Sequence, residues 1–202
     1  MWRSWQRVFD ILIHVIILLP LILLIWDAAN GLLGANPIRE IQLRTGRTAL
    51  ALLILSLAGT PAFLLTGNRW ALVLRRRLGL YAFLCAGLHF INFIAIDYGF
   101  NFSRIRQDIF DKRYAVVGFV AFLLLIPLAI TSTRGWLRRL GKNWSRLHRL
   151  VYIASVLAVI HLYWSLKADK RLALIYGGVL IFLLLLRLPA VQRAITRAHF
   201  KG

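Results

Sequence analysis

Long runs of apolar residues, separated by short basic segments, recur along the whole chain. Each run is close to the roughly 17–25 residues that a helix needs to cross the hydrocarbon core of a membrane. Backbone polar groups in lipid must be satisfied within their own segment, so these runs are expected to be helices. The pattern predicts a single all-α domain over residues 1–202, a membrane bundle of six transmembrane helices without an internal repeat. The predicted spans are residues 8–26, 48–65, 78–96, 114–131, 150–166 and 172–188.

The composition also favours a membrane protein. Hydrophobic residues make up 60% of the 202 positions and charged residues only 16%, whereas about a quarter of a soluble domain is charged. Disorder requires low hydrophobicity and is excluded. The formal net charge of +19 would suit a nucleic-acid-binding protein, but the apolar content does not.

The basic residues are shared unevenly between alternate loops. With a cytoplasmic N-terminus, 16 of the 26 Lys and Arg residues fall on the cytoplasmic side. Six of the seven acidic residues fall on the opposite side, and only Asp10 does not. The positive-inside rule therefore predicts an even number of spans with both termini in the cytoplasm.

The motif content excludes several classes of cofactor site. Cys85 is the single cysteine, so an intrachain disulfide, a CxxC metal site and covalent haem attachment through CxxCH are all excluded. The chain has neither a GxGxxG nor a GxxxxGK[ST] motif, so no dinucleotide or P-loop site is indicated. A redox cofactor would have to be held without covalent bonds.

Two histidines, His89 and His161, are predicted to lie at nearly the same depth in the membrane. His89 lies roughly 17 Å from the cytoplasmic end of the third span, and His161 lies roughly 20 Å beyond His148 at 1.5 Å per residue. Histidine inside a span is rare and is functional by default. Two imidazoles facing each other across a bundle suit the two axial positions of a b-type haem iron. The competing interpretations are a histidine bonded to a neighbouring helix and, less well supported, a zinc site.

The roles of His148 and His14 are less well defined by the sequence. On an ideal helix His148 points about 140° away from His161, and the arginines Arg75–Arg77 occupy the matching depth of the third span. A second haem thus lacks its obvious partner. His148 is left as a ligand with a non-histidine partner, or as a contact to a haem propionate or a flavin phosphate. His14, roughly 10 Å into the first span, is the other possible partner of His148, but a hydrogen bond between helices is its expected role.

Several short motifs resemble those of one known family. The most specific is LGKNWSRLHRLVY at residues 140–152, followed by HLYWSLK at residues 161–167. Other matches are LGANP at 33–37, TGRTAL at 45–50, RLGL at 77–80 followed by Leu88-His89, and TST at 131–133. Over nearly its whole length the chain resembles the MsrQ (YedZ) family of haem-binding membrane subunits, which belongs with the ferric-reductase-like transmembrane domains. That family commonly has Asp where Asn36 stands.

The resemblance implies a multi-pass protein of the bacterial inner membrane that carries haem b, with a second haem left open, and FMN. His89, His148 and His161 match the family's haem-associated histidines. Electrons would pass to MsrP, a periplasmic molybdopterin enzyme that reduces methionine sulfoxide for repair of oxidised proteins. The resemblance leaves open whether the donor is the quinone pool or a cytoplasmic flavin reductase. No catalytic residue is predicted in this chain.

The loops suggest where partners would bind. The segment Arg134–Arg149, with Trp136 and Trp144, is a candidate surface for the donor or a flavin, although any cytoplasmic interface attracts basic residues and Trp. The outer loops Asp27–Arg47 and Asp97–Arg113 would contact the acceptor. Two other functions remain open: a cytochrome b subunit of another quinone- or flavin-linked reductase, and a non-redox transporter or assembly factor with buried histidines.

Overall fold

The computed structural model describes residues 2–193, with the side chains of residues 10–107, 109 and 111–193. Every regular element in this part of the chain is helical, which confirms the predicted all-α class. The helices are α1 (Trp2–Ala29), α2 (Pro37–Thr66), α3 (Trp70–Ile91), η1 (Asn92–Asp97), α4 (Phe102–Asp111), α5 (Arg113–Ile130), α6 (Arg134–Leu140), α7 (Lys142–Leu147), α8 (Leu150–Ser165) and α9 (Arg171–Leu185).

Five helical segments of the described chain are long and apolar enough to cross a membrane. The five are Asp10–Ala29, Pro37–Thr66, Trp70–Asp97, Arg113–Ile130 and Lys142–Ser165. The sixth predicted span corresponds to α9, whose 15 residues extend roughly 22 Å, less than the roughly 30 Å hydrocarbon core. Proline at position 189 lacks the N–H that the Leu185 carbonyl would accept, and its ring crowds that carbonyl, so α9 stops earlier than the apolar run.

Helix α2 begins well before the apolar run that predicts it. The Asn36 side chain accepts a backbone N–H at 3.0 Å and Pro37 occupies the first turn, two features that start helices. Arg44 pairs with Glu40 at 2.8 Å and with Asp27 near the end of α1. Much of the predicted outer loop is therefore polar helix that is tied to α1 by charge.

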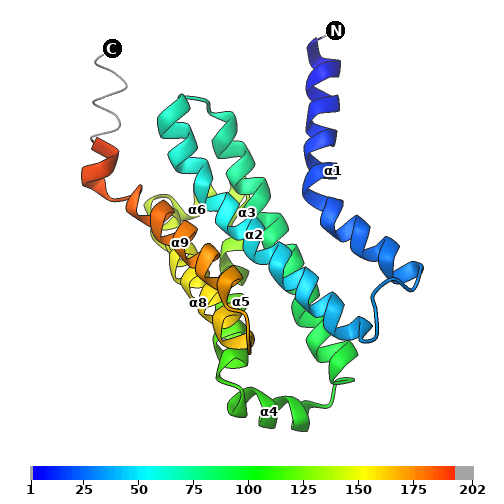
Figure 1. Ribbon diagram of the computed structural model, residues 1–202. Coiled ribbons are helices and arrows are strands. Elements are labelled where there is room, and N and C mark those ends of the chain that lie inside the picture. Colours follow the sequence, from blue (N-terminus) through cyan, green and yellow to red (C-terminus); the bar gives the residue numbers. More distant parts are fainter. Residues whose placement is uncertain (1, 194–202) are drawn as a thin grey trace.

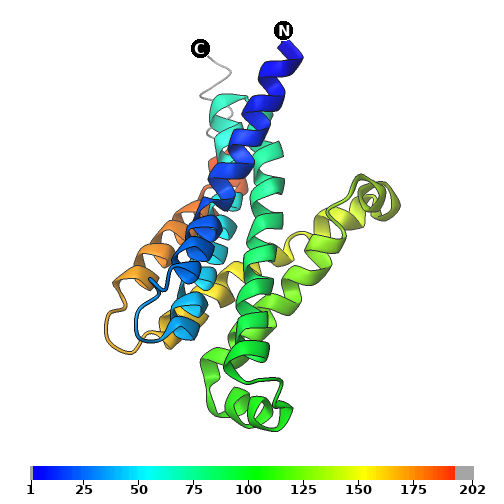
Figure 2. The ribbon, with the colours of Figure 1, turned by 90° about the vertical axis from the view of Figure 1, so that its right-hand side faces the viewer.

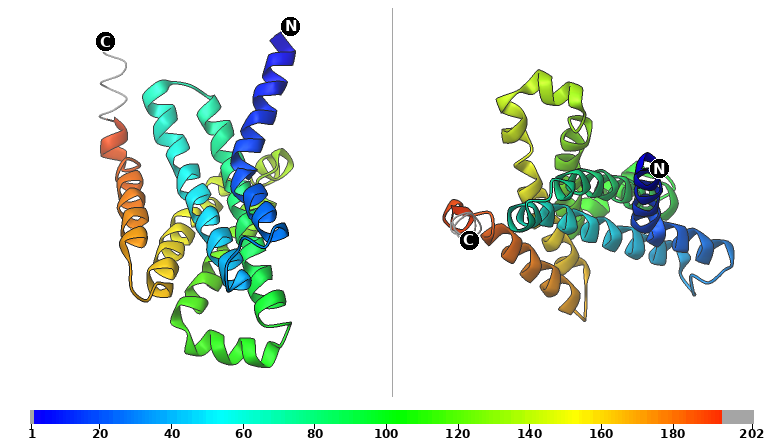
Figure 3. Two further views of the ribbon diagram at one scale, coloured as in Figure 1. Left: turned by 45° about the vertical axis from the view of Figure 1, so that its right-hand side comes forward. Right: turned by 90° about the horizontal axis from the view of Figure 1, so that it is seen from above.

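Two antiparallel helix pairs form the framework, α2 with α3 and α5 with α8. Figure 2 shows α5 and α8 running at an angle to α3, and Figure 3 shows α6 and α7 projecting to one side of the α2–α3 pair. Helix α9 packs against α8 and α2. Helix α1 makes fewer contacts and is bent, which follows from Pro20 inside it, because proline removes one helical hydrogen bond.

The helix directions agree with the grouping of loops by charge. In Figure 1 the N-terminus, the α2–α3 turn and the end of α9 lie toward one end of the bundle, and α4 and the α8–α9 turn lie toward the other. Which end faces the cytoplasm stays a prediction. Arg197 and Lys201, two of the cations assigned to the cytoplasmic side, lie outside the described residues.

The outer surface of the bundle is apolar. Ile16 and Ile25 of α1 are 66% and 69% exposed, whereas Leu57 and Cys85 in the core are 1% exposed. A water-soluble monomer rarely leaves an apolar surface of this extent uncovered. The surface is that of a protein with lipid around it.

Candidate functional site

The structure brings His89 and His161 together between the two helix pairs. His89 lies in the last turn of α3, and His161 lies in the fourth turn of α8. Their ring centroids are 6.0 Å apart and the ring planes are nearly perpendicular, at 87°. Both side chains are partly buried. Two histidines separated by 72 positions thus lie side by side inside the bundle.

Each of these imidazoles is anchored through Nδ1 to a backbone carbonyl of the neighbouring helix. His89 Nδ1 donates to the Gln42 carbonyl of α2 at 2.9 Å, and His161 Nδ1 donates to the Tyr114 carbonyl of α5 at 2.7 Å. A carbonyl oxygen only accepts, so the proton of each neutral ring is on Nδ1. Nε2 therefore carries the lone pair on both rings, as a metal-ligating histidine requires.

A polar network adjoins His89 on the α2 side. The Gln42 side-chain nitrogen lies 3.2 Å from His89 Nε2, and the Gln42 side-chain oxygen accepts from Asn92 Nδ2 at 2.6 Å. Asn92 Oδ1 is buried without a hydrogen-bond partner. Asn92 also begins the π-helical segment η1, and such segments are frequent at functional sites.

The sequence did not single out Gln42 or Asn92. Gln42 lies in the polar stretch that was predicted to be a loop, and Asn92 is one amide in an otherwise apolar run. An asparagine inside a membrane span is nevertheless a polar group that must find a partner. The sequence therefore indicated that Asn92 needs a hydrogen-bond partner, but not which residue the partner is.

The His89–His161 geometry suits one metal held by two imidazoles. Metal–imidazole bonds are about 2 Å long, so two rings that ligate one metal from opposite sides have centres roughly 6 Å apart. Neutral imidazole is a good ligand for iron. Within the described residues no group of three or more His, Cys, Asp or Glu side chains surrounds a metal position, which disfavours tetrahedral zinc. The fit is to a metal whose other ligands come from a prosthetic group, as in haem.

His148 is not part of this pair. It follows α7 and precedes α8, in a short break of the helix. The predicted angle of about 140° between the directions of His148 and His161 assumes one continuous helix, so it does not apply. Its ring stacks on Trp144 with centroids 3.8 Å apart, and its Nε2 lies 3.1 Å from Thr131 Oγ1. Trp144 is held in place by donating from Nε1 to the Thr131 carbonyl at 2.9 Å.

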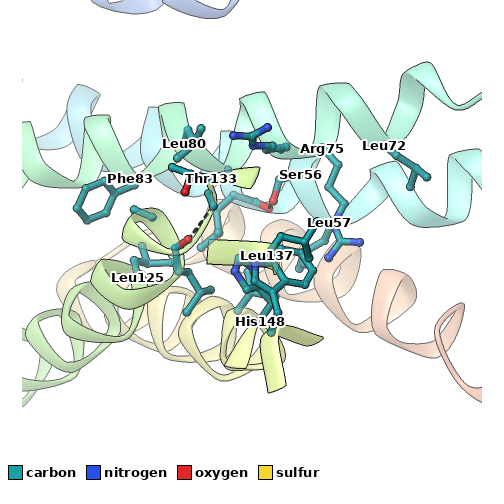
Figure 4. A pocket seen from close by; sticks show the side chains of 18 of the residues that line it. Ser56, Leu57, Leu72, Arg75, Leu80, Phe83, Leu125, Thr133, Leu137 and His148 are labelled. Carbon is teal, nitrogen blue, oxygen red and sulfur yellow. Dashed lines mark hydrogen bonds between the residues drawn. The ribbon is translucent and has the colours of Figure 1, made fainter. Parts of the chain in front are cut away.

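A second site, which we call the inner pocket, adjoins His148. It is a cavity of about 340 Å³ between α2, α3, α5 and the α6–α7 segment (Figure 4). Arg75 extends from α3 toward the side of the pocket on which His148 lies. Ser56, Ser132, Thr133 and Trp144 supply further polar or aromatic lining. The pocket combines positive charge with an aromatic wall.

Two arginines at the inner pocket and just behind it have no carboxylate partner in the described part of the chain. Arg75 donates to Thr60 Oγ1 at 2.8 Å. Arg187 donates to Tyr152 Oη at 2.6 Å and to the Leu57 carbonyl at 2.5 Å, and its Nε is buried without a partner. Partly buried cations that no acid neutralises favour an anionic ligand nearby.

His14 has the role that the sequence predicts. Its Nδ1 lies 2.7 Å from Tyr81 Oη, and the two rings meet edge to face at 5.7 Å. The hydrogen bond joins α1 to α3, and His14 is not among the residues of either site.

The comparisons with known proteins point in one direction. The family model for the ferric reductase like transmembrane component matches residues 45–159. Two proteins named "Protein-methionine-sulfoxide reductase heme-binding subunit MsrQ" are similar to the chain. The one from Xanthomonas axonopodis pv. citri is 45% identical over 86% of this chain and 82% of its own length. The one from Rhodospirillum rubrum is 47% identical over 95% of this chain and 93% of its own length. No solved structure matches the chain.

Proposed function

Because the chain belongs to the MsrQ family of ferric-reductase-like membrane proteins, we propose that it passes electrons through haem b to a periplasmic MsrP-like molybdopterin reductase. It is a redox subunit of a methionine sulfoxide reductase system. Reduction of methionine sulfoxide, which repairs oxidised periplasmic proteins, takes place on that partner. The protein lies in the bacterial inner membrane with six spans, α9 being the sixth, and with both termini in the cytoplasm.

One observation carries the proposal: two neighbouring imidazoles are anchored through Nδ1, so the lone pair of each ring is on Nε2. The Gln42 amide, which lies 3.2 Å from His89 Nε2, would give way to the metal. In the proposal His89 and His161 are the two residues that would hold the haem iron. Haem supplies a one-electron carrier that cycles between ferric and ferrous iron. Held by two protein ligands, the group would serve electron transfer and not oxygen binding. The carbonyls of Gln42 and Tyr114 fix the two rings, which holds the ligands ready in both redox states.

The inner pocket is proposed to hold a second prosthetic group. Its positive charge suits the propionates of a second haem b or the phosphate of FMN, and Trp144 and His148 offer planar side chains. With haem, His148 would be a ligand whose partner is not a histidine. With FMN, His148 and Arg75 would contact the phosphate.

The proposed direction of electron flow is from the cytoplasmic side outward. The donor is the quinone pool or a cytoplasmic flavin reductase, and the α6–α7 segment is the proposed contact surface for it. Trp136 lies under Arg139 at 5.5 Å on this segment, as expected of an interfacial basic helix. The α1–α2 connection and α4 are the proposed contacts for the acceptor.

The absorption spectrum of the detergent-purified protein tests the proposal. Reduction with dithionite should give the sharp bands of a low-spin b-type haem. Haem and flavin quantification on the same sample should then reveal what the inner pocket holds. A preparation with no haem bands would overturn the proposal and favour the transporter or assembly-factor function.

The identity of the partner is tested by reoxidation. The reduced protein should be reoxidised by MsrP in the presence of methionine sulfoxide, and not by MsrP alone beyond one turnover. Reoxidation by a different periplasmic enzyme, with none by MsrP, would instead favour a cytochrome b subunit of another reductase.

A further inference from the structure

Two glycines face the two paired histidines. Gly46 of α2 lies against the ring of His89, and Gly118 of α5 lies against the ring of His161. A Cβ atom on Gly46 would lie 2.9 Å from both Cε1 and Nδ1 of His89. A Cβ atom on Gly118 would lie 2.5 Å from Nδ1 and 2.7 Å from Cε1 of His161. Neither position can carry a side chain unless the imidazole moves.

Each glycine lies four residues after the carbonyl that accepts the histidine's proton. The carbonyls belong to Gln42 and Tyr114. In an α-helix the carbonyl of residue i is bonded to the N–H of residue i+4, so its oxygen lies beside that residue. A second donor that reaches the free lone pair of the same oxygen must pass over the side-chain position of residue i+4. Glycine leaves that path open.

The same unit therefore occurs twice, once in each helix pair. Both carbonyl–imidazole hydrogen bonds span 47 residues of sequence, and each glycine precedes its histidine by 43 residues. Helices α2 and α3 form one unit and α5 and α8 form the other, which are the two main packed pairs of the structure. The sequence displays no repeat, but the structure has two equivalent helix pairs, each of which fixes one histidine.

We propose that Gly46 and Gly118 are positioning residues that allow the backbone carbonyls to fix the two imidazoles with Nε2 directed toward one iron. The inference rests on the proposed function, in which His89 and His161 ligate haem. The glycines of α9 lack this role: Gly178 has no atom within 4 Å of the position of a Cβ, and Gly177 meets only Val159 at 3.6 Å.

The test compares Gly118→Ala, Gly46→Ala and the control Gly178→Ala in purified protein. We expect Gly118→Ala to retain haem about 10–100-fold more weakly, as for other losses of support behind a metal ligand. Gly46→Ala should have a smaller effect, because its clash is milder. Gly178→Ala should match the unmodified protein. Helical content by circular dichroism verifies that each variant is folded.

A second readout separates positioning from mere packing. In the haem that a variant retains, a weaker Nδ1–H hydrogen bond makes the ligand less basic, so the midpoint potential should become more positive. The electron paramagnetic resonance spectrum of the oxidised protein should change as well, since it depends on the orientation of the ligand planes. Unchanged haem content, potential and resonance spectrum in both alanine variants would overturn the inference.

A double variant covers the case in which Gly118→Ala does not accumulate. Combining it with His161→Ala removes the ring that the new methyl group meets, so the double variant should accumulate as well as His161→Ala alone. Failure of the double variant would overturn the inference, because the glycine would then serve helix packing. Failure of the proposed function looks different: low-spin haem would survive in His89→Ala and His161→Ala themselves.

Discussion

The histidine pair and the inner pocket use the same residue type in opposite ways. At the pair, both rings give Nδ1–H to backbone carbonyls, at 2.9 and 2.7 Å, which leaves the lone pair on Nε2. At the inner pocket, His148 stacks on Trp144, has its Nε2 beside the Thr131 hydroxyl and faces an arginine rather than a second histidine. The pair therefore offers imidazole lone pairs to a metal, and the inner pocket offers positive charge to an anion.

This difference indicates which kind of ligand each site can bind. Two anchored imidazoles recognise a metal and fix its ligation state, whereas uncompensated guanidinium groups recognise an anion. A metal-bearing prosthetic group with acidic side groups can use both kinds of site, but a flavin can use only the second. The experiments below separate the two sites, from the largest expected effect to the smallest.

The largest effect is expected at the pair. His89→Ala or His161→Ala removes one axial ligand, and haem retention should fall by at least about tenfold, because even a ligand's supporting partner is worth that much. The remaining haem should be high-spin in its absorption and resonance spectra. His14→Ala is the matched control, a membrane histidine outside both sites, and its spectrum should be unchanged. Low-spin haem in both ligand variants would remove the distinction between the sites.

His148→Ala should affect the inner pocket and leave the pair intact. The low-spin bands assigned to the pair should persist, while the second cofactor should be retained about tenfold more weakly. Quantifying haem and FMN before and after the substitution identifies that cofactor. Loss of the low-spin bands themselves would mean that His148 ligates the haem that we assign to the pair.

The sequence was sufficient to predict the helices and the histidine pair, but not the hydrogen bonds that fix the two rings. Apolar runs and basic loops were sufficient for the helices, because lipid imposes length and composition on every span. Depth counting from the span ends was sufficient to match His89 with His161. The hydrogen bonds to the Gln42 and Tyr114 carbonyls were not predictable, because they depend on how neighbouring helices approach and rotate.

Two features of the structure were not predicted from the sequence, the early start of α2 and the environment of His148. The early start of α2 depends on the cap at Asn36 and on ion pairs of Arg44, which apolarity does not register. The environment of His148 depends on a helix break before α8, whereas the predicted direction of its ring holds only for a continuous helix. Helix caps and helix breaks depend on a few neighbouring residues. Which side chains they bring to a site is decided only when the helices pack against one another.

Arg75→Gln should weaken anion binding at the inner pocket by a moderate amount. Glutamine can keep the hydrogen bond to Thr60 but removes the charge, and a hydrogen bond to a charged group is worth about 1.5–3 kcal/mol. The affinity for the second cofactor should fall roughly tenfold and become less sensitive to salt. Arg138→Gln, at an exposed position of α6, is the charge-matched control. Equal effects of both substitutions would indicate general surface electrostatics and not a defined anion site.

The smallest effect is expected from Tyr81→Phe, which removes the hydroxyl that bonds His14 at 2.7 Å. One hydrogen bond contributes about 1 kcal/mol, so the thermal midpoint should fall by a few degrees at most, about 2–4 °C for a chain of this size. Tyr81 lies on α3 between Arg75 of the inner pocket and His89 of the pair. A change at Tyr81 would therefore reach both sites if α3 transmitted it. With Tyr176→Phe on α9 as the control, unchanged haem content and midpoint potential are expected for Tyr81→Phe. A shift in either one would mean that the α1–α3 contact supports ligation, and that the two sites are not independent.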